Sequence, residues 1–292
     1  MERGVRQGDT ISSILFTLVL EDVFKNLNWD KKGIKVDGGM LNHLRFADDV
    51  VVLASSLEEL QTMLEQLHHT SAQVGLKMNL SKTKTLNENE EQVNVNGQRI
   101  ENVKEYIYLG HAIKLGKENQ TTEISRRIKL GWAAFGKLNF IFKSKIPNSL
   151  KRDVYNKCVL PVMTYGLETM TMTARSVNRL RVSQRAMERA MMGISLRDHI
   201  RNEDIRRQTR ITDIVERIAN SKWSWAGHLA RQSEERWAKR LLCWRPRLAK
   251  RPVGRPPKRW TDDIQTVAGK NWMRRAQNRN EWKKLREAYI LQ

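Results

Sequence analysis

The chain has 292 residues, of which 40% are hydrophobic and 29% charged, and its formal net charge at pH 7 is +21. This composition is ordinary for a globular protein with room for two compact units. No apolar run reaches 18 residues and no cleavable apolar segment follows the N-terminus, so we expect neither membrane insertion nor secretion, and an intracellular location. The sequence has two cysteines, Cys158 and Cys243, which are too few and too far apart to indicate a disulfide framework or a zinc site, and we expect both thiols to be buried.

The positive charge is concentrated in the C-terminal part of the chain. Residues 1–116 contain 13 Lys and Arg against 16 Asp and Glu, a net charge of −3. Residues 117–292 contain 40 against 16, a net charge of +24. Such asymmetry favours a polyanionic partner, because each Lys or Arg that neutralises a phosphate releases condensed counterions. A solvated basic surface without a partner is the alternative.

The first 116 residues alternate between helical and strand patterns. An apolar run over residues 11–27 predicts a helix, and a turn-rich break at 29–33 leads to a strand at 34–36. A helix with an acidic first turn follows Ser56. Its apolar stripe consists of Leu57, Leu60, Met63, Leu64, Leu67 and Val74. Strand patterns at residues 76–78, 93–95 and 106–109 then complete a predicted α+β fold, a small antiparallel sheet backed by two helices.

After Gly116 the pattern changes to long helices with basic outer faces. Apolar residues recur at helical spacing, which predicts a helical bundle in which Met and Trp serve mainly as packing residues. The stripes are Ile124, Ile128, Trp132 and Phe135; Leu150, Val154 and Cys158; and Leu180, Gln184, Met187 and Met191.

Prolines mark an extended linker over residues 245–259. The predicted organisation is therefore 1–116, 117–244, the linker 245–259, and a Trp-rich helical region 260–292. Inside the linker, residues 251–259 resemble an AT-hook, whose Arg enters a narrow A·T minor groove. Arg251, Arg255 and Lys258 are the DNA-binding candidates. A basic Pro-rich spacer or nuclear-import patch explains the same residues equally well.

The tetrapeptide Phe46-Ala47-Asp48-Asp49 lies between two apolar runs, where one strand turns back into another. Two adjacent carboxylates at a hairpin tip repel each other unless a cation neutralises them. Mg2+ accepts one or two carboxylates together with substrate phosphates, so Asp48 and Asp49 are candidate metal ligands. A solvated turn is the alternative for this tetrapeptide taken alone.

Four blocks occur in the order and at roughly the spacing found in reverse transcriptases: residues 3–9, 46–49, 75–83 and 106–110. The chain closely resembles the C-terminal part of the endonuclease–reverse transcriptase polyproteins of non-LTR, LINE-like retrotransposons. The resemblance implies a partial palm over residues 1–116 and a helical, basic, thumb-like region after it. It implies RNA-directed DNA synthesis primed at a nicked chromosomal target, and hence a nuclear location.

The resemblance also implies roles for individual residues. Asp48 would ligate both Mg2+ ions and Asp49 would complete the site, while Lys82 would place a charge near the leaving phosphates. Gln7 and Gly8 would contact the nucleotide and template. Tyr108, Leu109 and Gly110 would form the primer grip. The implied partners are an RNA template, a DNA primer or target, and deoxynucleoside triphosphates in the full-length enzyme.

The match breaks in ways that predict lost catalysis. The family uses a third metal-binding aspartate from an earlier strand, and no later acid replaces it by motif or spacing. Thr10 and Ser13 stand where the family usually has proline, and Ile107 replaces a residue that is commonly basic. We therefore expect a catalytically incomplete reverse transcriptase fragment. The alternatives are a non-catalytic nucleic-acid-binding protein derived from such an element, or a translated relic without a stable fold.

Overall fold

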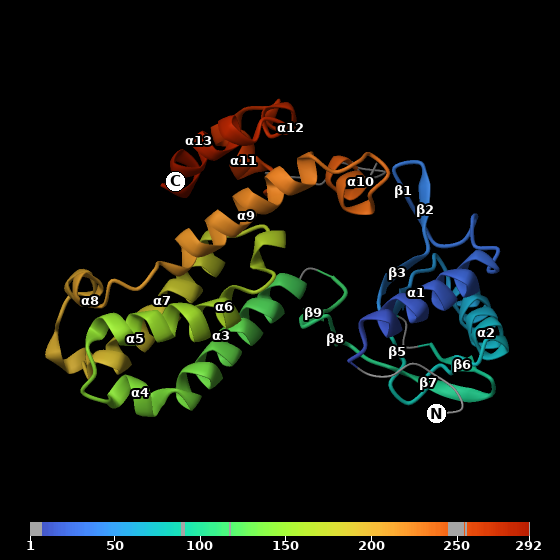
Figure 1. The fold of residues 1–292 in the computed structure, drawn as a ribbon, viewed down its shortest axis with the longest axis horizontal. Coiled ribbons are helices and arrows are strands. Elements are labelled where there is room, and N and C mark those ends of the chain that lie inside the picture. The colour runs from blue at the N-terminus through green and yellow to red at the C-terminus, as the bar shows by residue number, and fades with distance from the viewer. Residues whose placement is uncertain (1–7, 89–90, 117, 245–253, 255, 292) are drawn as a thin grey trace. The chain divides into compact units, whose positions relative to one another are not determined.

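The structure is a computed structural model that describes residues 8–88, 91–116, 118–244, 254 and 256–291 (Figure 1). Contacts divide the chain into two compact units. Met1–Tyr106 together with Arg240–Leu248 forms what we call the sheet unit, and Ile107–Lys239 together with Ala249–Gln292 forms the helical unit. In the described ranges, no helix is both long and apolar enough to cross a bilayer.

The sheet unit contains two helices and short strands that pair in small separate sheets. Its elements are α1 Thr10–Lys25, β1 Ile34–Val36, β2 Gly39–Leu41, β3 His43–Phe46, β4 Asp49–Val52, α2 Leu57–Gln73, β5 Lys84–Thr85, β6 Val93–Val95 and β7 Gln98–Asn102. Strands β1–β2 and β3–β4 are two-stranded antiparallel hairpins. Strand β7 pairs antiparallel with β6 and parallel with β5.

Side-chain caps start both helices of this unit. The Asp9 carboxylate accepts a hydrogen bond from the Ile11 amide at 3.0 Å, and the Ser56 hydroxyl accepts one from the Glu59 amide at 3.2 Å. Helix α1 therefore begins at Thr10 although proline is absent there, because an Asp at the N-cap satisfies one of the amides that the first turn leaves unpaired.

The core of the sheet unit lies between the two helices and the β3–β4 hairpin. Buried side chains from α1 and α2, including Val23 and Met63, both 0% exposed, pack with Val50, Val52 and Met78. The stripe predicted for α2 is confirmed at its centre, where Met63, Leu64 and Leu67 are buried, while Val74 at its end is 41% exposed. The α+β class is thus correct, but the described strands form several small sheets instead of one.

The helical unit contains one hairpin and a set of packed helices. Its elements are β8 Tyr106–Tyr108, which begins at the boundary, β9 His111–Ile113, α3 Asn119–Lys137, α4 Asn139–Lys143, α5 Asn148–Val154, the π-helix Tyr155–Val159, α6 Leu160–Thr164, α7 Ala174–Met192, α8 Asn202–Thr209, α9 Ile214–Ala230, α11 Asp262–Ala268, α12 Trp272–Arg275 and α13 Arg279–Ile290. Helix α10, Trp237–Cys243, spans the boundary near Lys239.

The predicted stripe of α7 is confirmed, because Leu180, Gln184, Met187 and Met191 are all buried. Gln184 is tolerated in the core because its amide donates to the Thr212 carbonyl at 2.7 Å and accepts from the Ile214 amide at 3.0 Å. These bonds tie the middle of α7 to the start of α9.

The stripe predicted over α5 is wrong at both ends, although Val154 at its centre packs against the core. Leu150 is 52% exposed and Cys158 is also exposed, whereas Tyr155 and Val159 are fully buried. The Tyr155 ring fills the core near Phe142 and Phe135, so the large aromatic side chain sets which face turns inward. Cys243 is exposed as well, and the prediction of buried thiols is wrong for both cysteines.

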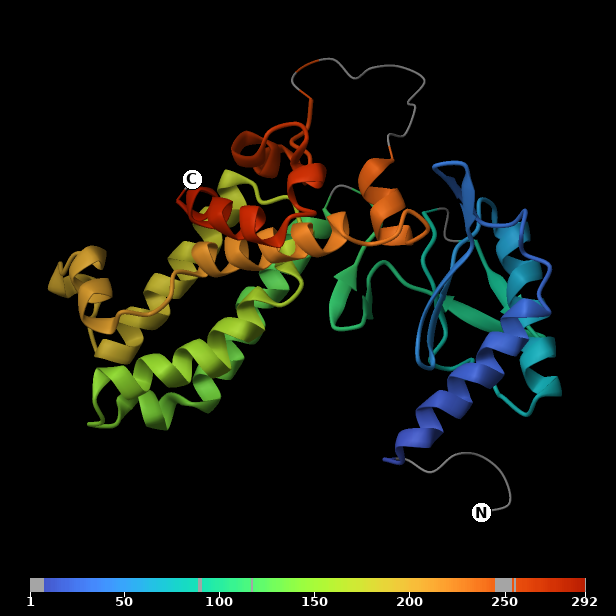
Figure 2. The same ribbon diagram turned by 45° about the horizontal axis from the view of Figure 1, so that its top comes forward.

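The C-terminal helices α11–α13 pack beside α9 (Figures 1 and 2). The rings of Trp223 and Trp282 stack with centroids 3.9 Å apart, and each indole N–H donates to the other residue's carbonyl at 2.9 and 3.0 Å. A Cβ added to Gly227 would lie 2.5 Å from the Trp282 indole nitrogen, so only glycine allows this approach. The domain boundaries predicted at residues 116, 244 and 259 remain predictions.

Candidate active site and nucleic-acid interface

The two candidate metal ligands sit at the tip of the β3–β4 hairpin. Phe46 pairs with Asp49, so Ala47 and Asp48 form a two-residue turn. Ala47 has a φ of 52°, which an L-residue with a side chain rarely adopts. Such a turn reverses the chain sharply, and both aspartates, Asp48 in the turn and Asp49 at the start of β4, are exposed. Backbone strain of this kind is often found at functional sites.

The base of this hairpin is held firmly while its tip is open. The guanidinium of Arg45 donates to the Glu21 carboxylate of α1 at 2.6 Å and lies 4.5 Å from the centre of the Phe24 ring. His43 packs on the same ring with centroids 4.3 Å apart, and burial, followed by the charge of Arg45, lowers the pKa of His43 from 6.5 to about 4. The carboxylates therefore project from a fixed strand pair.

The described residues supply two carboxylates for a cation and no larger cluster. Within those ranges, no group of three His, Cys, Asp or Glu side chains is close enough to hold a metal ion together. Asp48 and Asp49 are hard oxygen donors, which suits Mg2+ when substrate phosphates supply further ligands. The donor set fits a divalent cation that is shared with a substrate.

The other predicted site residues of the sheet unit are less informative. Gln7 lies outside the described residues, and Gly8, with a φ of 91°, is exposed just before the cap of α1. Lys82 is exposed in a turn in which its backbone amide donates to the Asn79 carbonyl at 3.1 Å. This turn continues from Met78, which packs in the same core as β4, so the segment bearing Lys82 starts beside the hairpin.

The predicted primer grip is a second hairpin, β8–β9. Leu109 and Gly110 form its turn with φ values of 48° and 73°, and Tyr108 precedes them as the end of β8. The Tyr165 hydroxyl donates to the Leu109 carbonyl at 3.1 Å, and guanidinium groups of Arg126 and Arg127 donate to the Gly110 carbonyl. The structure thus brings the three predicted residues together and fixes the turn from one side.

Exposed Lys and Arg side chains cover several outer faces of the helical unit. They lie on α3, on α7, around α8 and on the C-terminal helices. Exposed basic residues include Lys129, Lys137, Arg175, Arg181, Arg197, Arg201, Arg207, Arg210, Lys270, Arg274, Arg279, Lys283, Lys284 and Arg286. Of the AT-hook candidates, Lys258 is exposed, whereas Arg251 and Arg255 lie outside the described residues. The excess positive charge of the C-terminal part of the sequence is therefore accessible to solvent on the helical unit.

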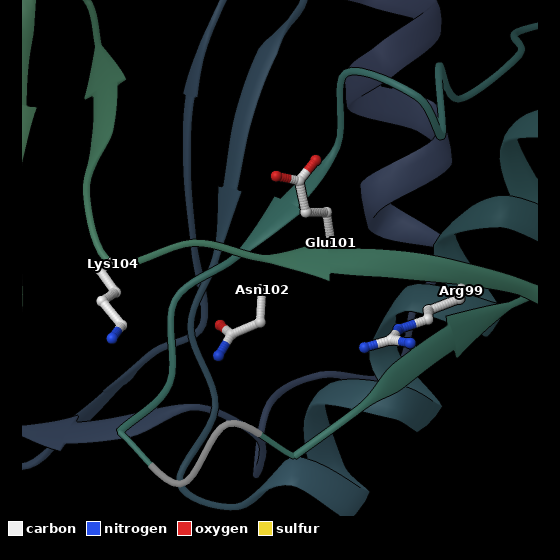
Figure 3. Close-up of a pocket in the computed structure, with 4 residues that line it drawn as sticks. All are labelled: Arg99, Glu101, Asn102 and Lys104. Atoms are coloured by element: carbon white, nitrogen blue, oxygen red, sulfur yellow. The ribbon is translucent and has the colours of Figure 1, made fainter.

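A separate open hollow of about 450 Å³ lies along β7 in the sheet unit. Figure 3 shows the four residues that line it, Arg99, Glu101 and Asn102 from β7 and Lys104 from the segment that follows. Glu101 is paired with Lys84 at 2.5 Å. None of these residues was predicted as part of the site, and the hollow lacks paired carboxylates, so it is distinct from the β3–β4 tip.

Residues 1–113 match the reverse transcriptase (RNA-dependent DNA polymerase) family. An uncharacterized transposon-derived protein of Caenorhabditis elegans is 33% identical over 269 residues, which cover 85% of this chain and 96% of that protein. The Pol polyproteins of the R2 retrotransposable elements of Drosophila melanogaster and Nasonia vitripennis are 39% and 38% identical over 84 residues, 29% of this chain and only 8% of each polyprotein.

The chain belongs to the reverse transcriptases of non-LTR retrotransposons. Both hairpins, at 46–49 and 106–110, fall within the matched residues, and so do Gly8 and Lys82. Members of this family generally use divalent metal ions and act on nucleic acid. The nematode relative extends the similarity through most of the helical unit, of which the family match covers only the first residues, up to 113.

The residues that hold the β8–β9 hairpin in place were not among those predicted from the sequence. Glu123, Arg126, Arg127 and Tyr165 lie in the helical unit and contact the turn or its strand. One signal was present, because Glu123 and Arg127 are four residues apart on a predicted helix, the spacing of an intrahelical ion pair. Tyr165 could not have been assigned, since it follows the hairpin by more than fifty residues.

Proposed function

We propose that this reverse transcriptase-family chain binds nucleic acid through its helical unit but does not polymerise DNA by itself. The observation that carries the proposal is the β3–β4 tip, where two exposed carboxylates have no third acidic partner among the described residues. In full-length relatives the partners would be an RNA template, a DNA primer or target, and deoxynucleoside triphosphates. Action on chromosomal DNA would place the chain in the nucleus.

Within that proposal, Asp48 and Asp49 hold Mg2+ jointly with the phosphates of a nucleotide. A bound divalent cation would stabilise charge on the attacking and leaving oxygens of phosphoryl transfer. Lys82 supplies a positive charge for the phosphates, and Gln7 and Gly8 line the base pair. With two carboxylates alone, the metal would be held weakly.

A primer-extension assay tests the catalytic half of the proposal. The purified chain, given an RNA template, a DNA primer, Mg2+ and all four deoxynucleoside triphosphates, should extend no primer above background. Robust extension that Asp48→Ala abolishes and Glu88→Ala leaves intact would refute it. Glu88 is an exposed acid of the same unit outside the four motif blocks, so it controls for loss of charge alone.

A titration against salt tests the binding half. Contact with six or more phosphates should weaken binding by roughly three orders of magnitude or more between about 50 and 200 mM salt. A flat salt response would count against electrostatic binding. The measurement is fluorescence anisotropy with duplex and single-stranded probes.

The second candidate function is recognition of A·T-rich duplex by the linker. The motif around Arg255 favours it, because arginine is drawn to the negative potential of a narrow minor groove. Arg255→Ala should reduce the preference for A·T-rich over G·C-rich duplex, whereas Lys258→Ala should weaken both about equally, as a phosphate contact does. Equal loss of binding to both duplexes in Arg255→Ala would leave only the spacer interpretation.

A further inference from the structure

The Leu109–Gly110 turn is held from behind by charged groups of α3. Glu123 is fully buried, and its carboxylate accepts a hydrogen bond from the Ala112 amide of β9 at 2.8 Å. The same carboxylate pairs with Arg127, whose side chain is 5% exposed. Arg127 also donates to the Gly110 carbonyl. One buried ion pair therefore binds both the turn and the strand that follows it.

Two further contacts complete this fastening. Arg126 donates to the Gly110 carbonyl at 3.0 Å, and the Tyr165 hydroxyl donates to the Leu109 carbonyl at 3.1 Å. The guanidinium of Arg127 lies 4.7 Å from the centre of the Tyr165 ring. Both carbonyls of the turn are consequently occupied by side chains of the helical unit, so the turn is fixed to α3 and to the segment after α6.

The hairpin itself also has exposed apolar and aromatic side chains. Tyr106 is 37% exposed, Ile107 is 52% exposed and Leu109 is 38% exposed. The exposed apolar and aromatic groups are available to stack on or pack against a nucleotide, while the arginine charge behind them is already used by Glu123 and by carbonyls. Arg127 is thus placed to shape the turn and not to contact a phosphate.

From this arrangement we propose that Glu123, Arg127 and Tyr165 are positioning residues, which hold the Leu109–Gly110 turn in the form that contacts the end of a primer. The inference rests on the proposed nucleic-acid-binding function and extends it to residues outside the family's motif blocks. Arginine suits position 127 because its planar group holds two separate donors in a fixed geometry, one on the Glu123 carboxylate and one on the Gly110 carbonyl, whereas the donors of lysine all radiate from one nitrogen.

The structure offers variants that separate geometry from charge and from folding. Arg127→Lys keeps the charge and loses the fork. Tyr165→Phe removes a single hydrogen bond from an exposed residue and leaves the ring in place. Arg185→Lys is the matched control, because Arg185 also pairs with a fully buried carboxylate, that of Glu188, in the same unit but does not touch the hairpin.

Hydrogen exchange on the intact chain measures the fastening directly. A peptide that covers residues 105–114, released by an acid-active protease after the exchange is quenched, contains the whole hairpin and none of the substituted positions. We expect exchange in this peptide to rise about tenfold or more in Arg127→Lys and about two- to tenfold in Tyr165→Phe, the range for one lost hydrogen bond. Arg185→Lys should leave it unchanged. Unchanged exchange in Arg127→Lys would overturn the inference whether or not nucleic acid binds.

Photocrosslinking then tests the contact. A DNA primer annealed to an RNA template carries a photoreactive nucleotide at its 3′ end, and the share of crosslinks in peptide 105–114 is measured beside the affinity. The inference predicts that Arg127→Lys lowers that share at least fivefold with less than a twofold change in Kd. Wild-type binding without a crosslink in this peptide would overturn the inference and leave the binding proposal standing, whereas absence of binding would refute the proposed function itself.

Discussion

The two units differ in where their notable charged side chains lie: exposed in the sheet unit and buried in the helical unit. In the sheet unit, the two motif carboxylates Asp48 and Asp49 are exposed at a hairpin tip. In the helical unit, Glu123 and Glu188 are fully buried and Lys222 is 2% exposed, and each is paired with an oppositely charged group. A buried charge costs several kcal/mol unless its partner is well placed, so the helical unit depends on specific pairs for its stability.

The unit that carries the family's sequence motifs is therefore not the unit whose core depends on buried ion pairs. The sheet unit carries the residues that place the chain in its family, yet its described carboxylates lack a third partner. The helical unit lies mostly outside the family match, yet its buried networks demand a defined fold. The packing of the basic unit therefore supports the proposed binding better than the β3–β4 tip supports catalysis.

The largest expected effect is the loss of a buried ion pair in the helical unit. Lys222 on α9 donates to both carboxylate oxygens of Asp263 on α11 at 2.9 and 2.7 Å, and burial lowers the pKa of Lys222. Asp263→Ala leaves that ammonium buried without a partner, which should lower the free energy of unfolding by about 3–5 kcal/mol.

Chemical denaturation monitored by tryptophan fluorescence measures this loss. Glu287→Ala, which removes an exposed carboxylate from α13, is the control and should change the free energy of unfolding by less than about 0.5 kcal/mol. Similar small values for both variants would show that α11 does not pack on α9 in solution, and the contrast between the units would disappear.

How far sequence could predict this arrangement differs between the units as well. The period of α7 gave its buried face, including the polar Gln184, because a regular helix repeats every 3.6 residues. The stripe over α5 failed because Tyr155 competes with Leu150 for the core, and spacing alone cannot rank two neighbouring faces that are both partly apolar.

The candidate site shows the same limit. The turn at Asp48 and Asp49 followed from local chain reversal between apolar strands, which sequence encodes directly. The fastening of Leu109 by Tyr165 depends on residues distant along the chain, and no local pattern reports such contacts. Exposure of Cys158 was missed for a related reason, since its hydrophobic character predicts burial but the neighbouring Val159 takes the inward position.

A middle-sized effect should appear in the sheet unit on acidification. The pKa of His43 is lowered to about 4 in the folded chain and is 6.5 as its ordinary value, so the unfolded chain binds more protons between these values. Stability from the neutral ring is fully present above pH 6.5 and is lost as pH falls toward 4. The loss should stay below about 3 kcal/mol, because the ring is only partly buried and solvent screens its charge.

Hydrogen exchange of β3 and β4 as a function of pH measures this response. His43→Gln keeps a polar side chain that does not titrate. In this variant, protection of β3 and β4 against exchange should therefore not fall between pH 6.5 and 4.5 as it does in the wild type. Below that window, protonation of Glu21, whose pKa the Arg45 guanidinium lowers, adds a further loss in both proteins. An unchanged pH profile in His43→Gln would show that His43 is accessible to solvent and not packed on Phe24.

The smallest expected effect on stability, and the sharpest test of the sheet unit's surface, concerns helix α1. Ile14 and Leu18 are 61% and 60% exposed on its outer face, whereas Leu20, two residues further, is 8% exposed. Leu18→Glu should change the free energy of unfolding by less than about 0.5 kcal/mol, since the added charge stays in water. Leu20→Glu should lower it by several kcal/mol, because a buried carboxylate there has no partner.

The same pair of variants tests whether the exposed apolar face is open in solution. An uncovered apolar stripe promotes association between chains, so Leu18→Glu should reduce self-association in sedimentation velocity over a range of protein concentrations. If Leu18→Glu destabilises the chain as strongly as Leu20→Glu, the outer face of α1 is covered in the folded protein. The contrast between the two units would then rest on the carboxylates at the β3–β4 tip alone.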